Sequence, residues 1–436
     1  MINQENKSIF WHRRDLRIDD NNGLFQALNH SEKVFPVFIF DTNILSKLLK
    51  TDRRAEMIYS EIIRLKEEYE ELGSSLIIRH GKPEEILPQL IRECGADSIY
   101  ANEDYEPYAI GRDRAIEKKI LPTTLSLFKD HVIFAKDEVM KNDGLPYTIF
   151  TPYKNKWKAT LTEEDIAQFD CVSLAAKLAK ITGNEELEFI NLGFERSESL
   201  LLQPRIVRTS ILKNYHNTRD IPSMKGTSQL SFHLRFGTLS IRKLAQIAQN
   251  TNEKYLDELI WRDFYQMILF HFPESENHSF KKKYEGIKWI NNESDFKAWR
   301  EGKTGYPIVD AGMRQLNQTG WMHNRVRMIV ASFLCKHLLI DWKWGETYFA
   351  SQLIDYDCAS NVGGWQWAAG TGCDAQPYFR VFNPYTQQQK FDKEFDYIKR
   401  WIPEFDTDEY PEAIVEHAFA RKRAIACYKT HLESLS

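Results

Sequence analysis

Short apolar runs and helical patterns alternate along the N-terminal part of the chain. Four runs rich in β-branched and aromatic residues predict strands, at Ser8–Trp11, Val34–Phe40, Leu76–Arg79 and Ser98–Ala101. Helical periodicity occurs in three places between and after them, at Arg53–Leu72, from Pro83 to Cys94 and near Gly111–Lys119. This alternation predicts an α/β domain over residues 1–130, with a Rossmann-like parallel sheet covered by helices on both faces. No GxGxxG dinucleotide fingerprint follows these strands.

The rest of the chain divides into an irregular stretch and a helical one. Residues 131–205 show no steady period and are acid-rich near Glu163–Asp170 and Glu185–Glu195, so we interpret them as an interdomain connector. Residues 206–436 carry helical patterns, separated by Gly and Pro, at Tyr255–Phe270, Ile308–Thr319, Asn324–Leu339 and Glu346–Ile354. We therefore expect an all-α C-terminal domain.

Composition narrows the class of protein. Apolar residues make up 42% and charged residues 28% of the 436 positions, which is typical of a globular protein with about two domains. No apolar run is long enough to span a membrane, and the polar start, Met1–Ser8, predicts no signal peptide. The six cysteines are scattered without metal-ligand spacing, so we expect no metal site, reduced thiols and a cytoplasmic location.

The distribution of charge and of tryptophan is uneven. Although the net charge is −4, the segment from Arg205 to Leu244 holds eight Lys or Arg residues and one acid, Asp220. Such a surplus can neutralise several phosphates, and a solvated helix face is the alternative. Nine of the eleven tryptophans lie between Trp261 and Trp401. This enrichment indicates either a large aromatic core or a site for a flat ligand.

Two local patterns in the helical part suggest chemistry. Thr227–Ser231 (Thr-Ser-Gln-Leu-Ser) precedes a helical pattern, where side-chain hydroxyls and free N–H groups suit a pyrophosphate. An ordinary helix N-cap is the alternative. Glu258 and Trp261 are three residues apart in a helical segment and therefore share a face. Core packing is the alternative for this tryptophan.

Several strings in the right order over nearly the whole chain resemble the DNA photolyase/cryptochrome family, and within it the class I cyclobutane pyrimidine dimer photolyases. The strings are Phe10–Arg17 (FWHRRDLR), Phe150–Tyr153 (FTPY), Trp261–Tyr265 (WRDFY), Gly302–Pro307 (GKTGYP), Gly320–Met328 (GWMHNRVRM), Asp355–Asp357 (DYD), Asn361, Gly363–Trp367 (GGWQW) and Phe382–Pro384 (FNP). The family fold is an N-terminal α/β domain, a long connector and a helical domain that holds FAD. This agrees with the division into 1–130, 131–205 and 206–436.

The resemblance implies an FAD site in the helical domain. Arg327 and Asp355 would flank the isoalloxazine ring, where a cation favours an anionic reduced flavin; a structural salt bridge is the alternative. Asn361 would face flavin N5, and an amide can hydrogen-bond either protonation state of that nitrogen. Tyr356 stands where relatives often have a small residue, and we expect it to face away from the ribityl chain. The implied cofactor-binding residues are Tyr215, Thr227, Ser228, Gln229, Leu230, Ser231, Asn324, Arg327, Asp355, Asp357 and Asn361.

The resemblance also implies a pocket for a pyrimidine dimer in DNA. A dimer has to leave the duplex, as a flipped base does, and enter an apolar slot where aromatic faces stack on it. Glu258 and Asn324 would hydrogen-bond the pyrimidine edges, and burial beside Trp261 is expected to raise the pKa of Glu258, so that it donates. Arg219 and Arg325 would contact phosphates beside the lesion. The implied lesion and DNA contacts are Arg219, Glu258, Trp261, Asn324, Arg325, Met328 and Trp367, of which Glu258 and Met328, together with Asn361, would act in catalysis.

Three tryptophans match the chain that carries electrons from the surface to the flavin in this family: Trp289, Trp342 and Trp365. Ordinary core tryptophans are the alternative. The implied activity is light-driven splitting of cyclobutane pyrimidine dimers by electron transfer from excited reduced FAD. The family also implies a monomer, with dimer-containing DNA as its partner, in the cytoplasm or, in a bacterium, at the nucleoid.

Other members of the family provide the alternatives. A (6-4) photolyase has histidines at the positions of Asn324 and Met328, and the single-strand-preferring branch usually has Gln at the latter. A signalling cryptochrome without repair activity often carries a long C-terminal tail, whereas this chain ends about 50 residues after Asn383. A further alternative is light-independent, namely a nucleotide-binding α/β domain joined to a helical nucleic-acid binder.

The resemblance leaves the antenna chromophore open. Methenyltetrahydrofolate, a deazaflavin and a second flavin occur in relatives, in or beside the N-terminal domain. Asn102–Tyr108 is a candidate contact for it, and an ordinary polar loop is the alternative.

Overall fold

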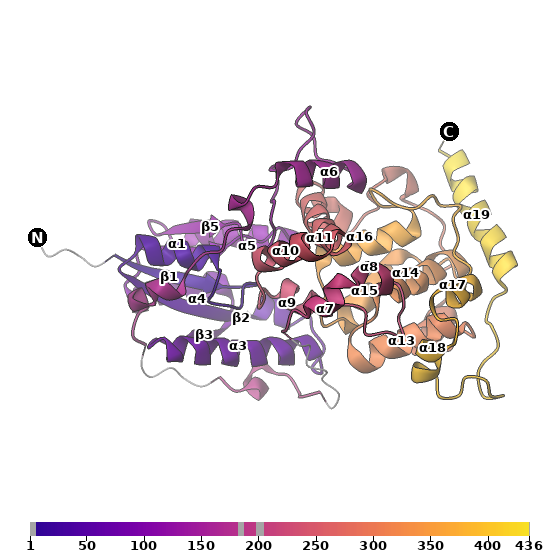
Figure 1. Cartoon of the computed structure of the whole chain (residues 1–436), viewed down its shortest axis with the longest axis horizontal. Coiled ribbons are helices and arrows are strands. Elements are labelled where there is room, and N and C mark those ends of the chain that lie inside the picture. Colours follow the sequence, from indigo (N-terminus) through magenta and orange to yellow (C-terminus); the bar gives the residue numbers. More distant parts are fainter. Residues whose placement is uncertain (1–5, 182–186, 198–204, 436) are drawn as a thin grey trace, which may run out of the picture. The chain divides into compact units, whose positions relative to one another are not determined.

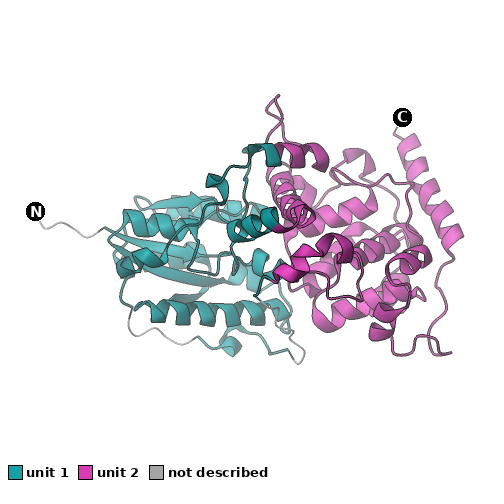
Figure 2. Ribbon diagram, viewed as in Figure 1, with its two compact units in different colours: residues 1–139, 157–207, 229–250 teal, residues 140–156, 208–228, 251–436 magenta. Residues whose placement is uncertain are grey.

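The computed structural model describes residues 6–181, 187–197 and 205–435. The chain forms two compact units, which Figure 2 shows in two colours. Unit 1 comprises Met1–Val139, Trp157–Val207 and Gln229–Asn250; unit 2 comprises Met140–Lys156, Arg208–Ser228 and Thr251–Ser436. Each unit is therefore assembled from interrupted stretches of sequence, whereas the sequence-based division used three continuous ranges.

A parallel sheet forms the centre of unit 1 (Figure 1). Its five strands run in the order β3-β2-β1-β4-β5 and are β1 (Lys7–His12), β2 (Lys33–Asp41), β3 (Ile77–Gly81), β4 (Ser98–Asn102) and β5 (Thr124–Phe128). Successive residues of a strand face opposite sides. Phe10 accordingly packs with α1 (Asn22–His30) and α3 (Arg53–Glu71), and Ile9 and Trp11 pack with α4 (Pro83–Cys94) and α5 (Pro107–Lys119). The predicted α/β domain with helices on both faces is confirmed.

The helices of unit 1 begin and end at local signals in the sequence. Asp52 precedes α3 and its carboxylate accepts a hydrogen bond from the backbone N of Arg54 at 2.8 Å. Pro83 opens α4, and Gly95 closes it with a φ of 62°, a left-handed conformation that glycine adopts without steric cost. A short helix, α2 (Thr42–Leu45), follows β2 directly.

The predicted connector contributes mostly to unit 1. Its residues 182–186 and 198–204 lie outside the described residues. Of the remainder, Ala179 donates a backbone hydrogen bond to Val34 O of β2 at 2.9 Å, and Cys171, Leu178 and Phe189 are buried in the same core as α1 and α3. Three short 3₁₀ turns mark its course, η1 (Glu164–Ile166), η2 (Val172–Lys177) and η3 (Phe189–Leu192). Packing against the sheet therefore fixes these residues, although they show no regular period.

Unit 2 is helical, which confirms the all-α prediction. Two helices, α6 (Phe150–Thr160) and α10 (Ile241–Thr251), run across the unit boundaries, and α9 (Ser231–Arg235) belongs to unit 1. The helices of unit 2 are α7 (Thr209–Lys213), α8 (Tyr215–Thr218), α11 (Glu253–His271), η4 (Pro273–Glu276), η5 (Lys282–Tyr284), α12 (Glu293–Glu301), α13 (Pro307–Thr319), α14 (Asn324–Ser332), η6 (Phe333–His337), α15 (Trp342–Gln352), α16 (Cys358–Ala369), α17 (Pro384–Phe391), α18 (Asp396–Trp401) and α19 (His417–Glu433).

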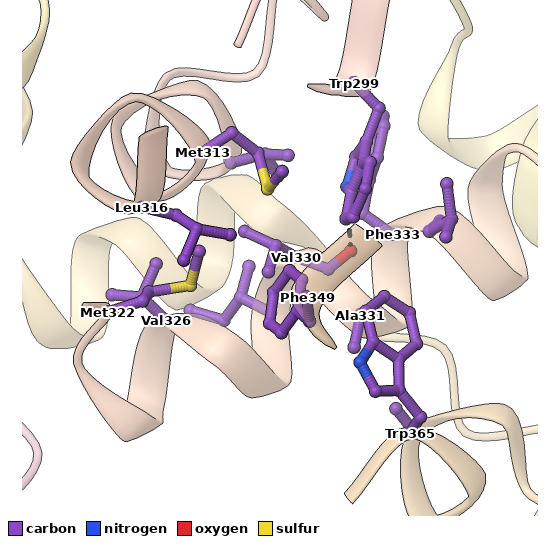
Figure 3. Packing of buried hydrophobic residues seen from close by; sticks show 14 of the residues in the cluster. Trp299, Met313, Leu316, Met322, Val326, Val330, Ala331, Phe333, Phe349 and Trp365 are labelled. Atoms are coloured by element: carbon purple, nitrogen blue, oxygen red, sulfur yellow. Dashed lines mark hydrogen bonds between the residues drawn. The ribbon is translucent and has the colours of Figure 1, made fainter. Parts of the chain in front are cut away.

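The predicted helix Asn324–Leu339 is divided in two. It is α-helical to Ser332 and continues as a π-helical turn over Phe333–His337, whose residues are all buried. This turn contributes to the large apolar core of unit 2. In the same core, Trp299 donates its indole N–H to Val330 O at 3.2 Å (Figure 3). This core supports α13, α14 and α16. Over the part of the chain that the structure describes, no helix combines the length and apolar character needed to cross a membrane.

Candidate functional site

The start of α16 is fixed by Asp357. Its carboxylate accepts a hydrogen bond from the backbone N of Ser360 at 3.0 Å, as an N-cap does. Gln266 of α11 donates its amide N to both Asp357 oxygens, at 3.1 and 3.0 Å. These contacts occupy the carboxylate and place Asn361 in the first turn of α16. A direct contact of Asp357 with a cofactor therefore stays a prediction.

The amide of Asn361 has a defined orientation. Its Nδ2 donates to Glu346 Oε1 at 2.9 Å and to Glu346 O at 3.2 Å. Both amide hydrogens thus have acceptors on α15, which leaves the carbonyl oxygen for a ligand. Burial raises the pKa of Glu346, and the hydrogen bond from Asn361 opposes that rise. The sequence left open whether Asn361 accepts or donates, and this geometry favours acceptance.

Arg327 and Asp355 form an ion pair. Arg327 Nη2 lies 2.9 and 3.1 Å from the two Asp355 oxygens, and its Nε donates to Met322 O at 2.8 Å. The Asp355 side chain is 2% exposed and that of Arg327 is 26% exposed. Among the described residues nothing accepts a hydrogen bond from Nη1 of Arg327. This NH₂ group of the guanidinium can therefore still bind an anion. This donor, together with the free oxygen of Asn361, fits a reduced flavin, which has an anionic edge and an N–H at N5.

Tyr356 points its hydroxyl at the same carboxyl group as Asn361. The distance from Tyr356 Oη to Glu346 Oε1 is 3.3 Å, and the side chain packs against the apolar core of unit 2. That it faces away from a ribityl chain stays a prediction. The contact with Glu346 was not foreseen from the sequence.

The segment Thr227–Ser231 ends at a helix start, as predicted. Within unit 1, α9 begins at Ser231, and its N-cap residue Leu230 makes no side-chain cap hydrogen bond. Gln229 has a φ of 54°. Within unit 2, Ser228 Oγ lies 2.9 Å from the hydroxyl of Tyr255 on α11. Backbone donors and hydroxyls therefore occur where a pyrophosphate was expected.

The tyrosines beside this segment are buried. The ring of Tyr215 lies 5.0 Å from that of Tyr255, edge to face. Burial raises the pKa of Tyr255 to about 12, so its hydroxyl keeps its proton at neutral pH and can donate. Tyr215 thus supports the residue that holds Ser228.

Helix α11 presents Glu258 and Trp261 on one face, as their spacing predicted. Trp261 stacks on Phe150 at a centroid distance of 3.6 Å and an interplanar angle of 7°. One face of the indole is therefore covered by Phe150, and the Tyr265 ring lies 5.4 Å from the indole at an interplanar angle of 28°. Phe150 belongs to the FTPY string, yet the sequence analysis did not place it in the pocket.

Glu258 forms an ion pair with Arg219, which directly follows α8. Burial raises the pKa of Glu258, whereas the Arg219 guanidinium opposes the rise. The direction agrees with the expectation from the sequence. Asp220 links this pair to a second arginine, because its Oδ1 lies 3.8 Å from Arg219 Nε and 2.8 Å from Arg325 Nη2. Both arginines expected at phosphates are thus held by carboxylates, and Asp220 is a member of the site that the sequence analysis missed.

The remaining pocket residues lie on α14 and α16. Asn324 is exposed at the start of α14, and its Nδ2 lies 4.0 Å from Met328 Sδ, one turn further on. Trp367 is partly buried, with its ring 6.4 Å from that of Phe382. Their proposed contacts with a lesion stay predictions.

The three tryptophans of the expected electron route differ in burial. Trp342 and Trp365 are each 2% exposed, and Trp289 is partly buried against the same core. A Cβ at Gly345 would come within 2.1 Å of the Trp365 ring, so this glycine allows close packing of Trp365 on α15. Trp342 lies three residues before Gly345, on the same side of α15. The burial thus decreases from Trp365 and Trp342 to Trp289.

Unit 1 holds a cavity of about 360 Å³ beside the carboxyl ends of β2 and β3. It is lined by Thr42, Leu45, Ser46, Leu48, Lys50, His80, Leu192, Gly193 and Phe194. This volume lies in the range of small-molecule sites. The segment Asn102–Tyr108, the candidate contact from the sequence, stays a prediction, but the amide of Asn102 is occupied by Asp15, Asn21 and Gly23, at 2.5, 2.7 and 2.8 Å. Asn102 therefore has a structural role.

Comparisons with known proteins cover the whole chain. Two family models match: "DNA photolyase" over residues 8–171 and "FAD binding domain of DNA photolyase" over residues 255–408. The deoxyribodipyrimidine photo-lyase of Escherichia coli is 38% identical over 97% of this chain and 98% of its own length. Among solved structures, a bacterial class III photolyase from Agrobacterium tumefaciens matches with a TM-score of 0.86 and 34% identity, covering 99% of this chain and 98% of its own.

A second structural relative bears on the cofactors. The archaeal photolyase from Sulfolobus tokodaii is described with two FAD molecules, with the implication of a novel light-harvesting cofactor. It matches with a TM-score of 0.84 and 34% identity, covering 97% of this chain and all of its own. The class III photolyase from Agrobacterium tumefaciens and the photolyase from Sulfolobus tokodaii are equally identical to this chain, at 34%. The assignment of this chain to class I therefore stays a prediction. On the family models and the full-length relatives together, the chain belongs to the DNA photolyase family.

Proposed function

We propose that this protein splits cyclobutane pyrimidine dimers in DNA by means of light, with FAD as its cofactor. The observation that carries the proposal is the end-to-end similarity to proteins named deoxyribodipyrimidine photo-lyase, at 34–38% identity over 96–97% of this chain in the two relatives from Synechococcus and Escherichia coli. The site described above is consistent with it. When bound, FAD would supply light absorption and a transferable electron.

The residues of unit 2 would hold the cofactor and exclude water. Arg327 would offer its Nη1 to the anionic edge of the ring, and Asp355 would hold that guanidinium in place. Asn361 would accept a hydrogen bond through its carbonyl oxygen. Ser228 would contribute a hydroxyl near the phosphates, while Tyr255 fixes its position.

The lesion would be bound on the face shared by Glu258 and Trp261. The indole would stack on the dimer with the face that Phe150 does not cover, and Met328 would fill the gap beside it. Glu258, whose pKa is raised, would donate to a pyrimidine oxygen, and Asn324 would bind the other polar edge. The proposal includes a monomer acting on DNA in the cytoplasm.

A repair enzyme for (6-4) photoproducts is disfavoured by Asn324 and Met328, because neither side chain can supply the proton that a histidine would. A photoreceptor without repair activity is the second candidate, since a cryptochrome from Synechocystis matches with a TM-score of 0.83 at 26% identity. The repair activity is favoured by the higher identity to photolyases.

A direct assay tests the function. The FAD-loaded, chemically reduced protein is mixed with an oligonucleotide that carries one thymine dimer and is exposed to blue light, with a dark sample as the control. We expect restoration of normal thymines in the illuminated sample only. A (6-4) substrate should stay unchanged. If the dimer survived illumination with fully reduced cofactor, the proposed function would be wrong.

The cavity in unit 1 is the proposed site of a second, light-harvesting chromophore. Leu45, Leu48 and Phe194 give it an apolar lining suited to an aromatic ring, and Lys50 and His80 can bind polar substituents. The description of the Sulfolobus tokodaii relative supports a flavin as one candidate.

DNA binding is expected to depend on the balance between Arg325 and Asp220. Changing Arg325 to Gln should weaken binding and reduce the slope of log affinity against log salt by about 1, because one phosphate contact is lost. Changing Asp220 to Asn should have the opposite effect on affinity, since it releases Arg219 and Arg325 from a competing carboxylate. Fluorescence anisotropy at several salt concentrations measures both.

The matched control is Arg314→Gln. Arg314 pairs with Glu404 at 2.6 Å and belongs to the same unit, but it does not contact the Asp220 network among the described residues. In this variant, the slope of log affinity against log salt should equal that of the unchanged protein. An unaltered slope in the Arg325 variant would remove this residue from the DNA contacts.

A further inference from the structure

The contact between Tyr356 and Glu346 connects this tyrosine to the amide of Asn361, which would face the flavin. Glu346 Oε1 accepts two hydrogen bonds, from Asn361 Nδ2 at 2.9 Å and from the Tyr356 hydroxyl at 3.3 Å. The donors come from different elements, since Asn361 lies on α16 and Tyr356 in the connection between α15 and α16. One partly buried carboxylate oxygen thus joins both side chains.

No cation balances the carboxylate of Glu346 within the described residues. The groups that act on it are Asn361, Tyr356 and Glu276, the last from η4. Glu276 carries a like charge and disfavours ionisation, as burial does, so both raise the pKa of Glu346. Only the two neutral donors, Asn361 and Tyr356, favour the charged form. Loss of the tyrosine hydroxyl would leave one donor and promote protonation.

Protonation of Glu346 would change what Asn361 offers to a ligand. An ionised carboxylate only accepts, so the Asn361 amide must turn its NH₂ group toward it and its oxygen outward. A protonated carboxyl also donates, and it can bind the amide oxygen instead, in exchange for the hydrogen bond from Nδ2 to the backbone oxygen of Glu346. The NH₂ group would then point outward. Reduced flavin has a hydrogen on N5, whereas oxidised flavin has only a lone pair there, so the two orientations favour different redox states.

We propose that Tyr356 is a positioning residue which, through Glu346, keeps the carbonyl oxygen of Asn361 turned toward the flavin, so that the site prefers a flavin with a hydrogen on N5. The inference rests on the proposed function insofar as the ligand is FAD.

The test compares the affinities of the apoprotein for oxidised and for reduced FAD. In Tyr356→Phe, the ratio of the two dissociation constants, oxidised over reduced, should fall about tenfold at neutral pH, which corresponds to loss of one hydrogen bond to a charged group. At alkaline pH, where Glu346 ionises without help, the ratio should return to that of the unchanged protein. Glu346→Gln should give a low ratio at every pH.

A second readout needs no cofactor. The infrared carbonyl stretch of a protonated buried carboxyl should persist to higher pH in the Tyr356→Phe apoprotein than in the unchanged one, and this signal should be missing from Glu346→Gln. The matched control is Tyr348→Phe, which removes a hydroxyl that donates to Asn317 Oδ1 at 2.7 Å from the same helix, α15, as Glu346. It should behave as the unchanged protein in both measurements.

The outcomes separate the two proposals. If the unchanged protein binds FAD and repairs dimers while Tyr356→Phe matches it in both readouts at every pH, the role of Tyr356 is wrong and the proposed function stands. If the unchanged protein binds neither form of FAD, the proposed function fails, and the inference with it. A ratio that falls equally in Tyr356→Phe and Tyr348→Phe would show general loosening and would also overturn the inference.

Discussion

Replacing Trp342 with phenylalanine is expected to slow the photoreduction of bound oxidised FAD about a hundredfold or more, and to leave repair by protein reduced beforehand unchanged. A phenyl ring is much harder to oxidise than an indole, so the positive charge left by electron transfer cannot rest at position 342. An added barrier of only about 2.7 kcal/mol gives a hundredfold loss of rate. Absorbance of the flavin under blue light, with an external reductant present, measures the rate.

The path through Trp342 stays a prediction, and the structure also offers a competing indole. Trp365 packs against Gly345 of α15, three residues beyond Trp342, where an added Cβ would come within 2.1 Å of the Trp365 ring. Trp299 is also near Trp365, with a centroid separation of 6.0 Å (Figure 3). Trp299 is fully buried at 0% exposure, whereas the third tryptophan of the expected route, Trp289, is partly exposed. A route that ends at Trp289 would therefore end near solvent.

Trp299→Phe is the matched control for this prediction. It removes the same atoms from the same apolar core, so the loss of packing is comparable. Photoreduction should continue in this variant at close to its normal rate. If Trp299→Phe stopped photoreduction and Trp342→Phe did not, the electron would travel through the deeper indole. Repair by reduced protein must persist in both variants, because that step needs no electron from the surface.

Elements with local signals could be predicted from the sequence. Pro307 and Gly320 bound α13, and the predicted range Ile308–Thr319 differs from the observed one by a single residue. Four of the five strands, β1 to β4, were found because apolar β-branched runs are distinctive. By contrast, β5 was missed, and none of its residues, Thr124–Phe128, is fully buried.

Helix α16 shows why a functional helix can escape notice. Its buried residues do lie on one side, but its sequence contains Gly363 and Gly364, and the large apolar Trp367 lies outside that buried side. The sequence alone therefore shows little contrast between an apolar and a polar face. The helix is specified by the local cap at Asp357 and by a tertiary contact, the close approach of the Tyr265 ring to Gly363, where a Cβ would come within 2.3 Å. Contacts of this kind are made by residues far apart in the sequence.

The same limit applies to the site. The family resemblance alone identified Glu258, Asn361 and Arg327 as site residues, because matching residue type and order along the chain is sufficient for this. The residues that contact them could not be predicted in the same way. Phe150 covers Trp261 across 111 positions, and Asp220 bridges to Arg325 across 105. The sequence contains no local sign of such pairs, although they decide which atoms remain available to a ligand.

Replacing Glu258 with alanine is expected to slow dimer splitting about tenfold and to weaken DNA binding much less. A hydrogen bond to a pyrimidine oxygen becomes stronger as negative charge develops on the ring, so its loss affects the reaction more than the bound state. Single-turnover repair under saturating protein and anisotropy with the same oligonucleotide separate the two quantities. Equal losses in both would show that Glu258 only binds.

The ion pair between Glu258 and Arg219 leads to a further expectation, namely that the protein takes up a proton when it binds DNA. In the free protein Arg219 holds the pKa of Glu258 lower than burial alone would set it. If DNA phosphates draw Arg219 away, Glu258 loses its counter-ion, its pKa rises further, and the protein takes up a proton on binding whenever the pH lies between the free and bound pKa values. Calorimetric titrations in buffers of different ionisation enthalpy should detect this uptake.

Two variants identify the group that takes up the proton. Glu258→Gln cannot take up a proton, so its binding enthalpy should be independent of the buffer. Arg219→Gln should show reduced uptake, because without the guanidinium the pKa of Glu258 is already raised before DNA arrives. Uptake that persists in Glu258→Gln would assign the proton to another group. In that case Glu258 would enter the complex in the same protonation state as in the free protein, and its role as a donor would have to be set by burial alone.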